Sequence, residues 1–466
     1  MIKKLFSHSL IYGLAPQITL VVNFLLLPFI TPHLTDLDFG VMGILTSYTT
    51  AISVLAVLGL RVVFVNSFYK SPMQYKWGWR QLYGFLTLWN FVYAIILALV
   101  VYLTVPQEAL HNRWIILVLN VVPLVVFGQT SMIGQTYFQL KQQPVQIAVR
   151  SLIFGLLTAF LDLLFINYFK MGYMGWFWAI FIATILRNAS YWFPLQKLGL
   201  TPIFNFKKRY IKNSLKVGLP AIPHFYSGYL LNSSNQLVMD QLNVDTASIG
   251  KYNAANTFGK LMDGMSTATG WAIGPILNEK FKIKDDFSAK YLLFVLQIFF
   301  LVVTFCLSIW LKELFALMIR NDVLKLTYPL GIILIMAQNY RPMYFGSNAK
   351  LMFEDKTNVI WKLTLVAGII NVVLNFALIP FYGFEVSVIC TYIAFLYMGF
   401  AGYFYPVFKT INKENFFPLV WMIIQIILTF AAYYLVEQKM ILKIICTVLV
   451  GCLGIFLIFK FNKNIK

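Results

Sequence analysis

Blocks of about twenty mainly apolar residues recur along nearly the whole chain of 466 residues, separated by short polar links. A helix needs roughly 20 apolar residues to cross the hydrocarbon core of a bilayer. Sixty per cent of the residues are hydrophobic and only 12% are charged, which is too little charge to cover a soluble surface. The sequence therefore predicts an all-α polytopic membrane protein of about 14 transmembrane helices. The expected spans are residues 8–31, 38–60, 82–104, 114–137, 146–168, 173–194, 215–239, 247–277, 291–311, 324–345, 357–379, 384–407, 416–436 and 441–460.

The links between these spans alternate in charge. The N-terminus and the even-numbered links are rich in cations such as Arg61 and Lys70, whereas the odd-numbered links hold few cations and carry acids such as Asp36 and Glu437. Because cytoplasmic loops collect Lys and Arg, this alternation predicts that both termini are cytoplasmic. The net charge of +20 then reflects topology, and its scattered clusters form no continuous basic face for nucleic acid.

The link over residues 195–214 is the longest and most basic of the predicted cytoplasmic links. We predict an N-terminal six-helix lobe (1–194), a basic cytoplasmic linker (195–214), a C-terminal six-helix lobe (215–407), and two additional helices with a cytoplasmic tail (408–466). The segment 9–16 is loosely repeated at 214–221, and Asp38-Phe39-Gly40 is echoed by Ser248-Ile249-Gly250. Chance similarity of apolar segments is one explanation. The equivalent positions favour a parallel internal repeat.

The same segments resemble a known family. The motifs are Gly13-Leu14-Ala15-Pro16, Asp38-Phe39-Gly40, Gly59-Leu60-Arg61, Gly218-Leu219-Pro220 and Ile249-Gly250-Lys251-Tyr252. Together with the expected spans, they resemble the Wzx-type polysaccharide flippases of the multidrug/oligosaccharidyl-lipid/polysaccharide (MOP) exporter superfamily, over nearly the whole chain. The resemblance implies two six-helix lobes around a central cavity, two peripheral C-terminal helices, and transport by alternating access.

The resemblance also implies a substrate. Wzx-type proteins flip undecaprenyl-diphosphate-linked oligosaccharide across the bacterial inner membrane for the synthesis of O-antigen, capsule or exopolysaccharide. The polysaccharide polymerase and the chain-length machinery are implied as partners beside the lipid bilayer, and no cofactor is implied. The absence of a nucleotide-binding motif from the sequence favours an ion gradient as the energy source.

An ionisable residue at the centre of a membrane-spanning helix raises the free energy of insertion by roughly 2.5–3.5 kcal/mol or more. Each such residue is therefore a candidate for a structural or functional role. Asp162 lies in the fifth expected span, and Lys260 and Asp263 lie three residues apart in the eighth. On a helix, Lys260 and Asp263 share one face and could simply neutralise each other. Alternatively, Lys260 contacts a diphosphate or acidic sugar and Asp263 tunes it. Asp162 and Asp263 are the candidates for ion coupling, and a contact of Asp162 with Arg150 is not expected at their separation of about 18 Å.

Three arginines lie near the predicted cytoplasmic ends of spans. Arg61 follows Gly59-Leu60, where its guanidinium could grip a diphosphate in bidentate fashion. The plainer alternative is a side chain that snorkels to the interface. That alternative applies more strongly to Arg187 and Arg341.

The seventh expected span is unusually polar for the bilayer. It holds His224, Asn232 and Asn235, together with two prolines and several serines. Such a helix could face water or sugar and could bend at its prolines. Its polar residues could instead join neighbouring helices by hydrogen bonds. We take His224, Asn232 and Asn235 as candidate substrate contacts beside Lys260 and Arg61.

Two other functions compete with a flippase. An ion-coupled multidrug antiporter of the same superfamily would share the topology, but an exporter of organic cations favours buried carboxylates, whereas the first span offers Asn23 and the eighth offers Lys260. A membrane-embedded glycosyltransferase or polymerase needs carboxylates and a sizeable extracytoplasmic site, whereas the outer links are short. No catalytic motif appears, and the four cysteines show no metal-ligand spacing, so we expect no catalytic residue and no metal site.

Overall fold

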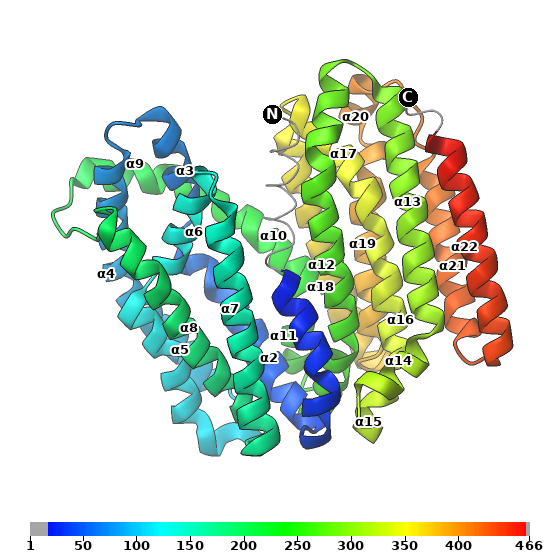
Figure 1. Ribbon diagram of the computed structural model, residues 1–466, viewed down its shortest axis with the longest axis horizontal. Coiled ribbons are helices and arrows are strands. Elements are labelled where there is room, and N and C mark those ends of the chain that lie inside the picture. The colour runs from blue at the N-terminus through cyan, green and yellow to red at the C-terminus, as the bar shows by residue number, and fades with distance from the viewer. Residues whose placement is uncertain (1–16, 463–466) are drawn as a thin grey trace. The chain divides into compact units, whose positions relative to one another are not determined.

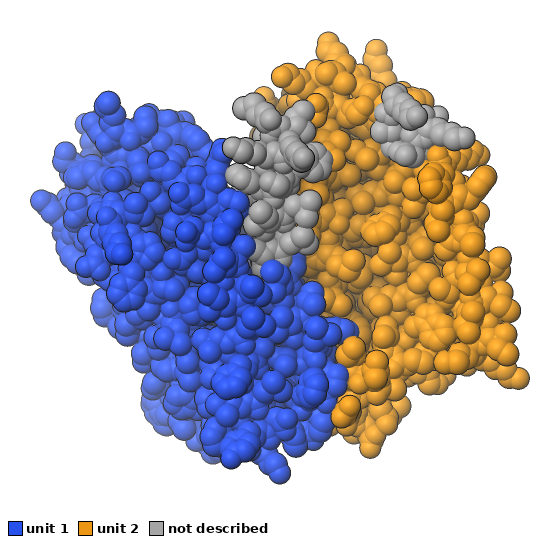
Figure 2. Space-filling model, viewed as in Figure 1, with its two compact units in different colours: residues 1–229, 245–250 blue, residues 230–244, 251–466 orange. Residues whose placement is uncertain are grey.

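The computed structural model describes residues 17–462, apart from the side chains of His224 and Asn462, and this range contains helices and no strand (Figure 1). The opening motif at 13–16 lies outside the described residues. The chain divides into two compact units (Figure 2): unit 1 is Met1–Tyr229 with Asp245–Gly250, and unit 2 is Leu230–Val244 with Lys251–Lys466. The boundaries predicted at 194, 214 and 407 are not tested by this division and stay predictions.

Unit 1 is a helical bundle whose described residues include two apolar cores. The core around Trp79, Tyr83 and Tyr191 joins α4, α6 and α8, and the core around Leu97 and Phe177 joins α2, α4, α5 and α8. After a helix over Gln17–His33, the elements are α2 (Asp36–Ser53), η2 (Val54–Ala56), α3 (Arg61–Lys70), α4 (Tyr75–Thr104), η3 (Gln107–Asn112), α5 (Arg113–Phe127), α6 (Thr130–Leu140), α7 (Pro144–Asp162), the π-helix η4 (Leu163–Tyr168), α8 (Tyr173–Lys197), α9 (Lys208–Gly218), η5 (Leu219–Ala221) and α10 (Ile222–Asn232).

Unit 2 is built around α13, which packs against α16, α17, α21 and α22. Its largest described core includes Leu277, Phe294, Phe400 and Trp421. The elements that follow α10 are α11 (Asn235–Gln241), α12 (Thr246–Lys282), α13 (Asp286–Ile309), α14 (Leu311–Met318), α15 (Asp322–Lys325), α16 (Tyr328–Ala337), η6 (Gln338–Tyr340), α17 (Arg341–Phe353), α18 (Thr357–Tyr382), α19 (Val386–Phe404), α20 (Pro406–Ile411), α21 (Pro418–Leu435) and α22 (Met440–Asn462).

The predicted class of an all-α polytopic membrane protein is confirmed. Within residues 17–462, nine helical stretches are long and apolar enough to cross a membrane, from Asp36–Lys70 to Met440–Phe461. Every expected span from 38–60 onward lies over one or more helices. The total of 14 spans stays a prediction.

Three expected spans are not the continuous helices that hydropathy predicts. Span 114–137 is broken at Gly128, whose φ of +53° ends α5. Span 215–239 becomes the end of α9, then α10 and α11, and span 324–345 becomes α15, α16, η6 and α17. A hydropathy window averages over such short breaks, because the residues on either side of them remain apolar.

The glycines of the sequence motifs lie where two backbones meet. A Cβ on Gly40 would lie 2.0 Å from the carbonyl oxygen of Thr246, and a Cβ on Gly250 would lie 1.8 Å from that of Asp36. The two echoing motifs therefore pack directly against each other within unit 1. Gly59 and Gly218 form a second contact of this kind, because a Cβ on Gly59 would lie 2.1 Å from the carbonyl oxygen of Gly218. Only glycine allows backbones to approach so closely.

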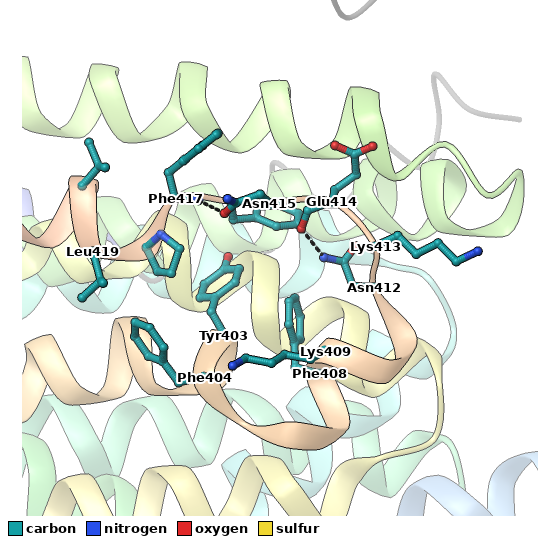
Figure 3. Close-up of a pocket in the computed structure, with 13 residues that line it drawn as sticks. Tyr403, Phe404, Phe408, Lys409, Asn412, Lys413, Glu414, Asn415, Phe417 and Leu419 are labelled. Atoms are coloured by element: carbon teal, nitrogen blue, oxygen red, sulfur yellow. Dashed lines mark hydrogen bonds between the residues drawn. The ribbon is translucent and has the colours of Figure 1, made fainter.

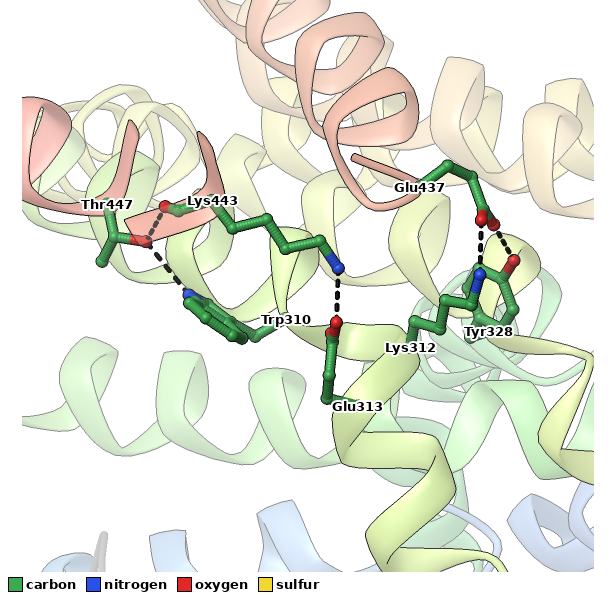
Figure 4. Close-up of polar contacts among 7 residues, drawn as sticks. All are labelled: Trp310, Lys312, Glu313, Tyr328, Glu437, Lys443 and Thr447. Carbon is green, nitrogen blue, oxygen red and sulfur yellow. Dashed lines mark hydrogen bonds and ion pairs between the residues drawn. The ribbon is translucent and has the colours of Figure 1, made fainter. Parts of the chain in front are cut away.

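The last helix is held to unit 2 by buried charge (Figure 4). Lys443 of α22 is 1% exposed, and its Nζ lies 2.6 Å from Glu313 Oε1 of α14. One turn further along α22, Thr447 accepts a hydrogen bond of 3.0 Å from Trp310 Nε1. The link before α22 is also bound to α14, because Glu437 accepts a hydrogen bond from Lys312 Nζ of α14 at 2.5 Å. Removing one partner of a buried ion pair leaves the charge of the other partner unneutralised, which lowers the stability of the protein.

We expect Lys443→Met to lower the free energy of unfolding by about 1–2 kcal/mol, less than for a fully buried pair because Glu313 can reach water. Glu313 is 41% exposed. Lys439→Met is the matched control, because Lys439 is exposed and only four residues away. The measurement is thermal unfolding in detergent. Equal midpoints for the two variants would contradict a stabilising role of the Lys443–Glu313 pair.

Candidate functional site

Unit 1 contains a polar pocket of about 440 Å³ between helices that are otherwise apolar. It lies between α7 and α8, with the helix over Gln17–His33 on one side. This helix touches α7 at Gly155, where a Cβ would lie 2.7 Å from Thr19 Oγ1. The lining residues are Thr19, Asn23, Gln135, Ile147, Arg150, Ser151, Phe154, Gly155, Thr158, Ile180, Ala183, Thr184, Arg187 and Tyr191.

Two arginines give this pocket a positive charge. Arg150 of α7 donates through Nη1 to the backbone oxygen and to Oε1 of Gln146, each at 2.8 Å. Its guanidinium also lies over the ring of Tyr191, at 4.9 Å from the centroid. The side chain of Arg187 in α8 is exposed and makes no hydrogen bond or ion pair with any residue in the described range; only its backbone oxygen accepts, from Ser190 Oγ at 2.7 Å. Arg150 is therefore held in place, while the Arg187 head group is available.

No acid balances these charges nearby. The pocket lining contains no Asp or Glu, and Asp162 is the only acidic residue between positions 109 and 239 of the sequence. Guanidinium groups bind phosphate or carboxylate with paired hydrogen bonds. Hydroxyl and amide groups from Thr19, Asn23 and Gln135 add donors and acceptors. The arrangement can hold an anionic, polar group within a membrane span.

The sequence favours an interfacial anchor for Arg187 and does not mark Arg150 as a site residue. A signal for both was nevertheless present: two arginines in consecutive spans of a stretch almost without acids. Arg150 and Arg187 belong to neighbouring antiparallel spans, and the stretch around them lacks acids.

Of the two alternatives for Lys260 and Asp263, mutual neutralisation is not observed. Asp263 forms an ion pair with Arg341 of α17 instead, and the Arg341 side chain is only 14% exposed. Lys260 Nζ donates to Asn253 Oδ1 at 3.3 Å on its own helix, α12. Arg341, 78 positions away in sequence, is the stronger partner because a guanidinium binds a carboxylate more rigidly than an ammonium does. Lys260 is exposed and has no acidic partner among the described residues, which leaves it available as an anion contact.

Asn235 lies in a buried amide network of unit 2 and is 3% exposed. Its Nδ2 donates to Tyr252 at 2.5 Å and to Thr391 at 2.7 Å, and its Oδ1 accepts from Asn371 at 2.7 Å. Asn371 also donates to the carbonyl oxygen of Leu230 at 3.1 Å, next to the break between α10 and α11. The contacts of Asn235 thus match the alternative of hydrogen bonding between helices.

The remaining predicted residues are spread over both units. Arg61 begins α3 in unit 1, is exposed, and donates to Gln139 Oε1 of α6 at 3.1 Å. His224 lies in α10, and its side chain is outside the described residues. Asn232 ends α10 and is exposed. Their roles in binding stay predictions.

Asp162 ends α7, where the helix passes into the π-helix η4. It is 4% exposed, and none of the described residues gives its Oδ1 a hydrogen bond. No contact with Arg150 is present in the structure, as expected from their spacing. A carboxylate so placed is costly when ionised, so it has the chemistry of a proton-binding group.

A second hollow, of about 490 Å³, lies where α19, α20 and α21 meet in unit 2 (Figure 3). Its polar groups order the link itself: Asn412 Nδ2 donates to the Glu414 carbonyl oxygen at 2.8 Å, and the Phe417 N–H donates to Asn415 Oδ1 at 2.9 Å. Lys409 and Lys413 also line it, together with aromatic residues such as Tyr403 and Phe408. Because Asn412 and Asn415 bond to the link itself and Glu414 is paired with Lys290 at 2.5 Å, we do not count this hollow as the main site.

Long apolar helices, with a positively charged pocket inside one of the bundles, define a multi-pass membrane protein. The comparison with known families agrees. The model of the family described as polysaccharide biosynthesis protein matches residues 3–281, more than half of the chain. The chain belongs to this family. Among curated proteins, no sequence gives a significant match.

Solved structures show the same fold. Lipid II flippase MurJ in an inward closed conformation has a TM-score of 0.69 at 14% identity, covering 92% of this chain and 97% of that chain. A multidrug resistance MATE family transporter of the MOP superfamily, inward-facing, has a TM-score of 0.59 at 14% identity, covering 87% and 96%. A mutant of the MATE transporter VcmN of Vibrio cholerae has a TM-score of 0.52 at 16% identity, covering 89% and 98%. The predicted resemblance therefore extends to the fold, which the chain shares with structures named as a flippase and as transporters of the MOP superfamily, while the family model links the chain to polysaccharide biosynthesis.

Proposed function

We propose that this protein is a flippase for undecaprenyl-diphosphate-linked oligosaccharide. It would move this lipid from the cytoplasmic to the periplasmic leaflet of the bacterial inner membrane by alternating access, with both termini in the cytoplasm. The family supports a place in polysaccharide biosynthesis, and the name of MurJ supports a lipid-linked precursor as the kind of cargo this fold can carry.

The observation that carries the proposal is the pocket of Arg150 and Arg187. A diphosphate presents several negatively charged oxygens, which match the two guanidinium groups in charge and in donor geometry. The pocket volume of about 440 Å³ suits such a head group and its first sugar. A pocket for organic cations would need carboxylates, and this lining holds none.

Several predicted residues keep a place in this proposal. Lys260 and Arg61 are exposed cations that would contact the anion at other stages of transport. Asn232 and His224 are candidates for contact with sugar hydroxyls. Asp162 would bind the coupling proton, because protonation removes a charge that the described residues leave without a hydrogen bond. The two predicted six-helix lobes, 1–194 and 215–407, would be the parts that rock against each other.

A translocation assay in proteoliposomes tests the cargo. Purified protein is reconstituted with a polyprenyl-diphosphate oligosaccharide, and the lipid that reaches the opposite leaflet is measured over time. A parallel set of vesicles measures the exchange of a cationic drug for protons. Flipping of the lipid without drug exchange is the expected result. Drug exchange without flipping would replace the flippase by a multidrug antiporter.

The same assay tests the cation contacts in unit 2 and at α3. Lys260→Ala and Arg61→Ala are each expected to slow flipping about tenfold at limiting lipid, because each variant loses one charge-assisted hydrogen bond to the substrate. Lys362→Ala is a control, since Lys362 is an exposed cation of α18 without a described partner. Unchanged flipping in both test variants would remove Lys260 and Arg61 from the binding path.

A further inference from the structure

The basic link between α8 and α9 is bound firmly to α4. The Ile203 N–H donates to the carbonyl oxygen of Arg80 at 3.1 Å, and Arg80 Nε donates to the carbonyl oxygen of Thr201 at 3.0 Å. The Lys207 N–H donates to Gln81 Oε1 at 3.2 Å. These bonds fix where α9 begins. Figure 1 shows α9 lying crosswise at one end of the unit 1 bundle, as expected of a helix at a membrane surface.

Helix α9 is amphipathic. Ile211, Ser214 and Gly218 are buried against α3 and α4. Lys208, Lys212 and Lys216 follow one another at intervals of four residues and therefore lie along one exposed stripe. The helix has basic residues on one face and apolar residues on another, the composition typical of a helix in the lipid interface.

A groove of about 700 Å³ runs beside this stripe. Its walls are apolar side chains of α4, α9 and the segments that flank α9, namely Phe85, Phe206, Ile211, Leu215, Leu219 and Pro220. The same three lysines stand at its rim. Just before α9, Lys207 Nζ lies 4.7 Å from the centroid of the Trp77 ring. Aromatic rings beside lysines are a feature of membrane interfaces.

The cations around this groove have no acidic neighbours in the sequence. The sequence holds no Asp or Glu from 61 to 107 or from 195 to 239, while these stretches contain ten Lys and Arg residues. No ion pair involves α9 within residues 17–462. The groove therefore combines an apolar interior with an uncompensated cationic rim.

We propose that the α9 groove binds one anionic phospholipid of the leaflet that adjoins α9, with an acyl chain between Phe206 and Leu215 and the phosphate among Lys208, Lys212 and Lys216. The apolar walls disfavour a free soluble anion, and the three lysines disfavour a neutral lipid. The bound lipid anchors α9, and through it the basic link, to the bilayer. This site is separate from the Arg150–Arg187 pocket, and its test does not depend on the cargo that is flipped.

Native mass spectrometry of the purified full chain measures the site directly. Dioleoyl phosphatidylglycerol and dioleoyl phosphatidylcholine are titrated separately, and the first bound lipid is quantified. We expect tighter binding of phosphatidylglycerol. The triple variant Lys208→Gln, Lys212→Gln, Lys216→Gln should weaken it by about 100-fold, since each lysine near an anionic surface contributes roughly a fivefold effect. The matched control Lys282→Gln, Lys284→Gln, Lys356→Gln removes the same charge from exposed positions of unit 2 and should bind like the wild type.

A second variant tests the groove without touching its charge. Leu215→Trp fills the apolar space and should weaken phosphatidylglycerol binding about tenfold, as expected for displacing part of an acyl chain. Equal losses in the α9 triple variant and its control would overturn the proposal, because only total charge would then matter. Equal affinity of the wild type for the two lipids, or full binding by Leu215→Trp, would overturn it as well.

Discussion

Replacing both pocket arginines, Arg150→Gln and Arg187→Gln, is expected to lower the rate of lipid-linked oligosaccharide flipping at limiting substrate by about 100-fold. Each charge-assisted hydrogen bond to a phosphate contributes about 1.5 kcal/mol or more, and about 1.4 kcal/mol changes an affinity tenfold. The measurement is the rate at which fluorescently labelled lipid reaches the opposite leaflet of proteoliposomes. The wild type and the variant are compared at the same amount of inserted protein.

The single variants separate binding from packing. Arg150 is bonded to Gln146 and stacks on Tyr191, so Arg150→Gln also disturbs the contact of α7 with α8. The Arg187 side chain has no described hydrogen-bond or ion-pair partner, so Arg187→Gln should slow flipping about tenfold and leave thermal stability unchanged. Arg187→Lys keeps the charge but loses the paired donors of the guanidinium. Its flipping rate should therefore lie between those of the wild type and Arg187→Gln.

A matched arginine outside the pocket controls for charge. The Arg113 guanidinium lies 4.4 Å from the Tyr102 ring centroid, a stacked setting like that of Arg150, but Arg113 does not line the pocket. Arg113→Gln should flip lipid at the wild-type rate. Wild-type flipping by Arg187→Gln, or an equal loss in Arg113→Gln, would contradict a diphosphate site in this pocket.

The class of fold could be predicted from the sequence because the bilayer fixes the length of each apolar block. The breaks inside spans could not, because they depend on contacts with other helices. The break after Asn232 persists because Asn371, more than 130 residues later, donates to carbonyl oxygens at the end of α10. Hydropathy shows that the residues around this break are polar. It does not show that Asn371 of a distant helix supplies the hydrogen bonds that allow α10 to end there.

The charged residues show the same limit. The spacing of Lys260 and Asp263 correctly places them on one helix face, yet the partner of Asp263 is Arg341 on another helix. Spacing along one helix predicts which groups could meet, whereas the tertiary packing decides which do. For Arg187, position near a span end suggested an interfacial anchor, and only the packing of α7 against α8 shows a pocket there.

The motif glycines illustrate what a pattern can and cannot reveal. Gly40 and Gly250 were recognisable as an echo, and the echo supported a resemblance to a family. That the two glycines lie at one backbone contact could not be read from their spacing, because their separation in sequence says nothing about which helix ends meet. The contact gives a physical reason for both residues: a side chain at either position would overlap a carbonyl oxygen.

Asn371→Leu is expected to lower the free energy of unfolding by about 3 kcal/mol, the largest single effect on stability that we predict. Asn371 is fully buried, and its Nδ2 donates to Asn235 Oδ1 at 2.7 Å and to the carbonyl oxygen of Leu230 at 3.1 Å. Leucine has a similar volume but no donor. The carbonyl oxygens at the end of α10 would then be left without this hydrogen bond in a place that water does not reach.

The measurement is unfolding in mixed micelles with increasing denaturing detergent. Asn358→Leu is the control, because Asn358 is exposed in the first turn of the same helix, α18, and should be near neutral. Asn371→Asp tests the donor through pH, because a protonated aspartic acid can donate a hydrogen bond and an ionised one cannot. We expect this variant to be as unstable as Asn371→Leu at a pH where the carboxyl is ionised, and to regain stability when it is protonated. If the stability of Asn371→Asp did not depend on pH and equalled that of the wild type, the hydrogen bonds to the α10 carbonyls would not be what holds the helix break.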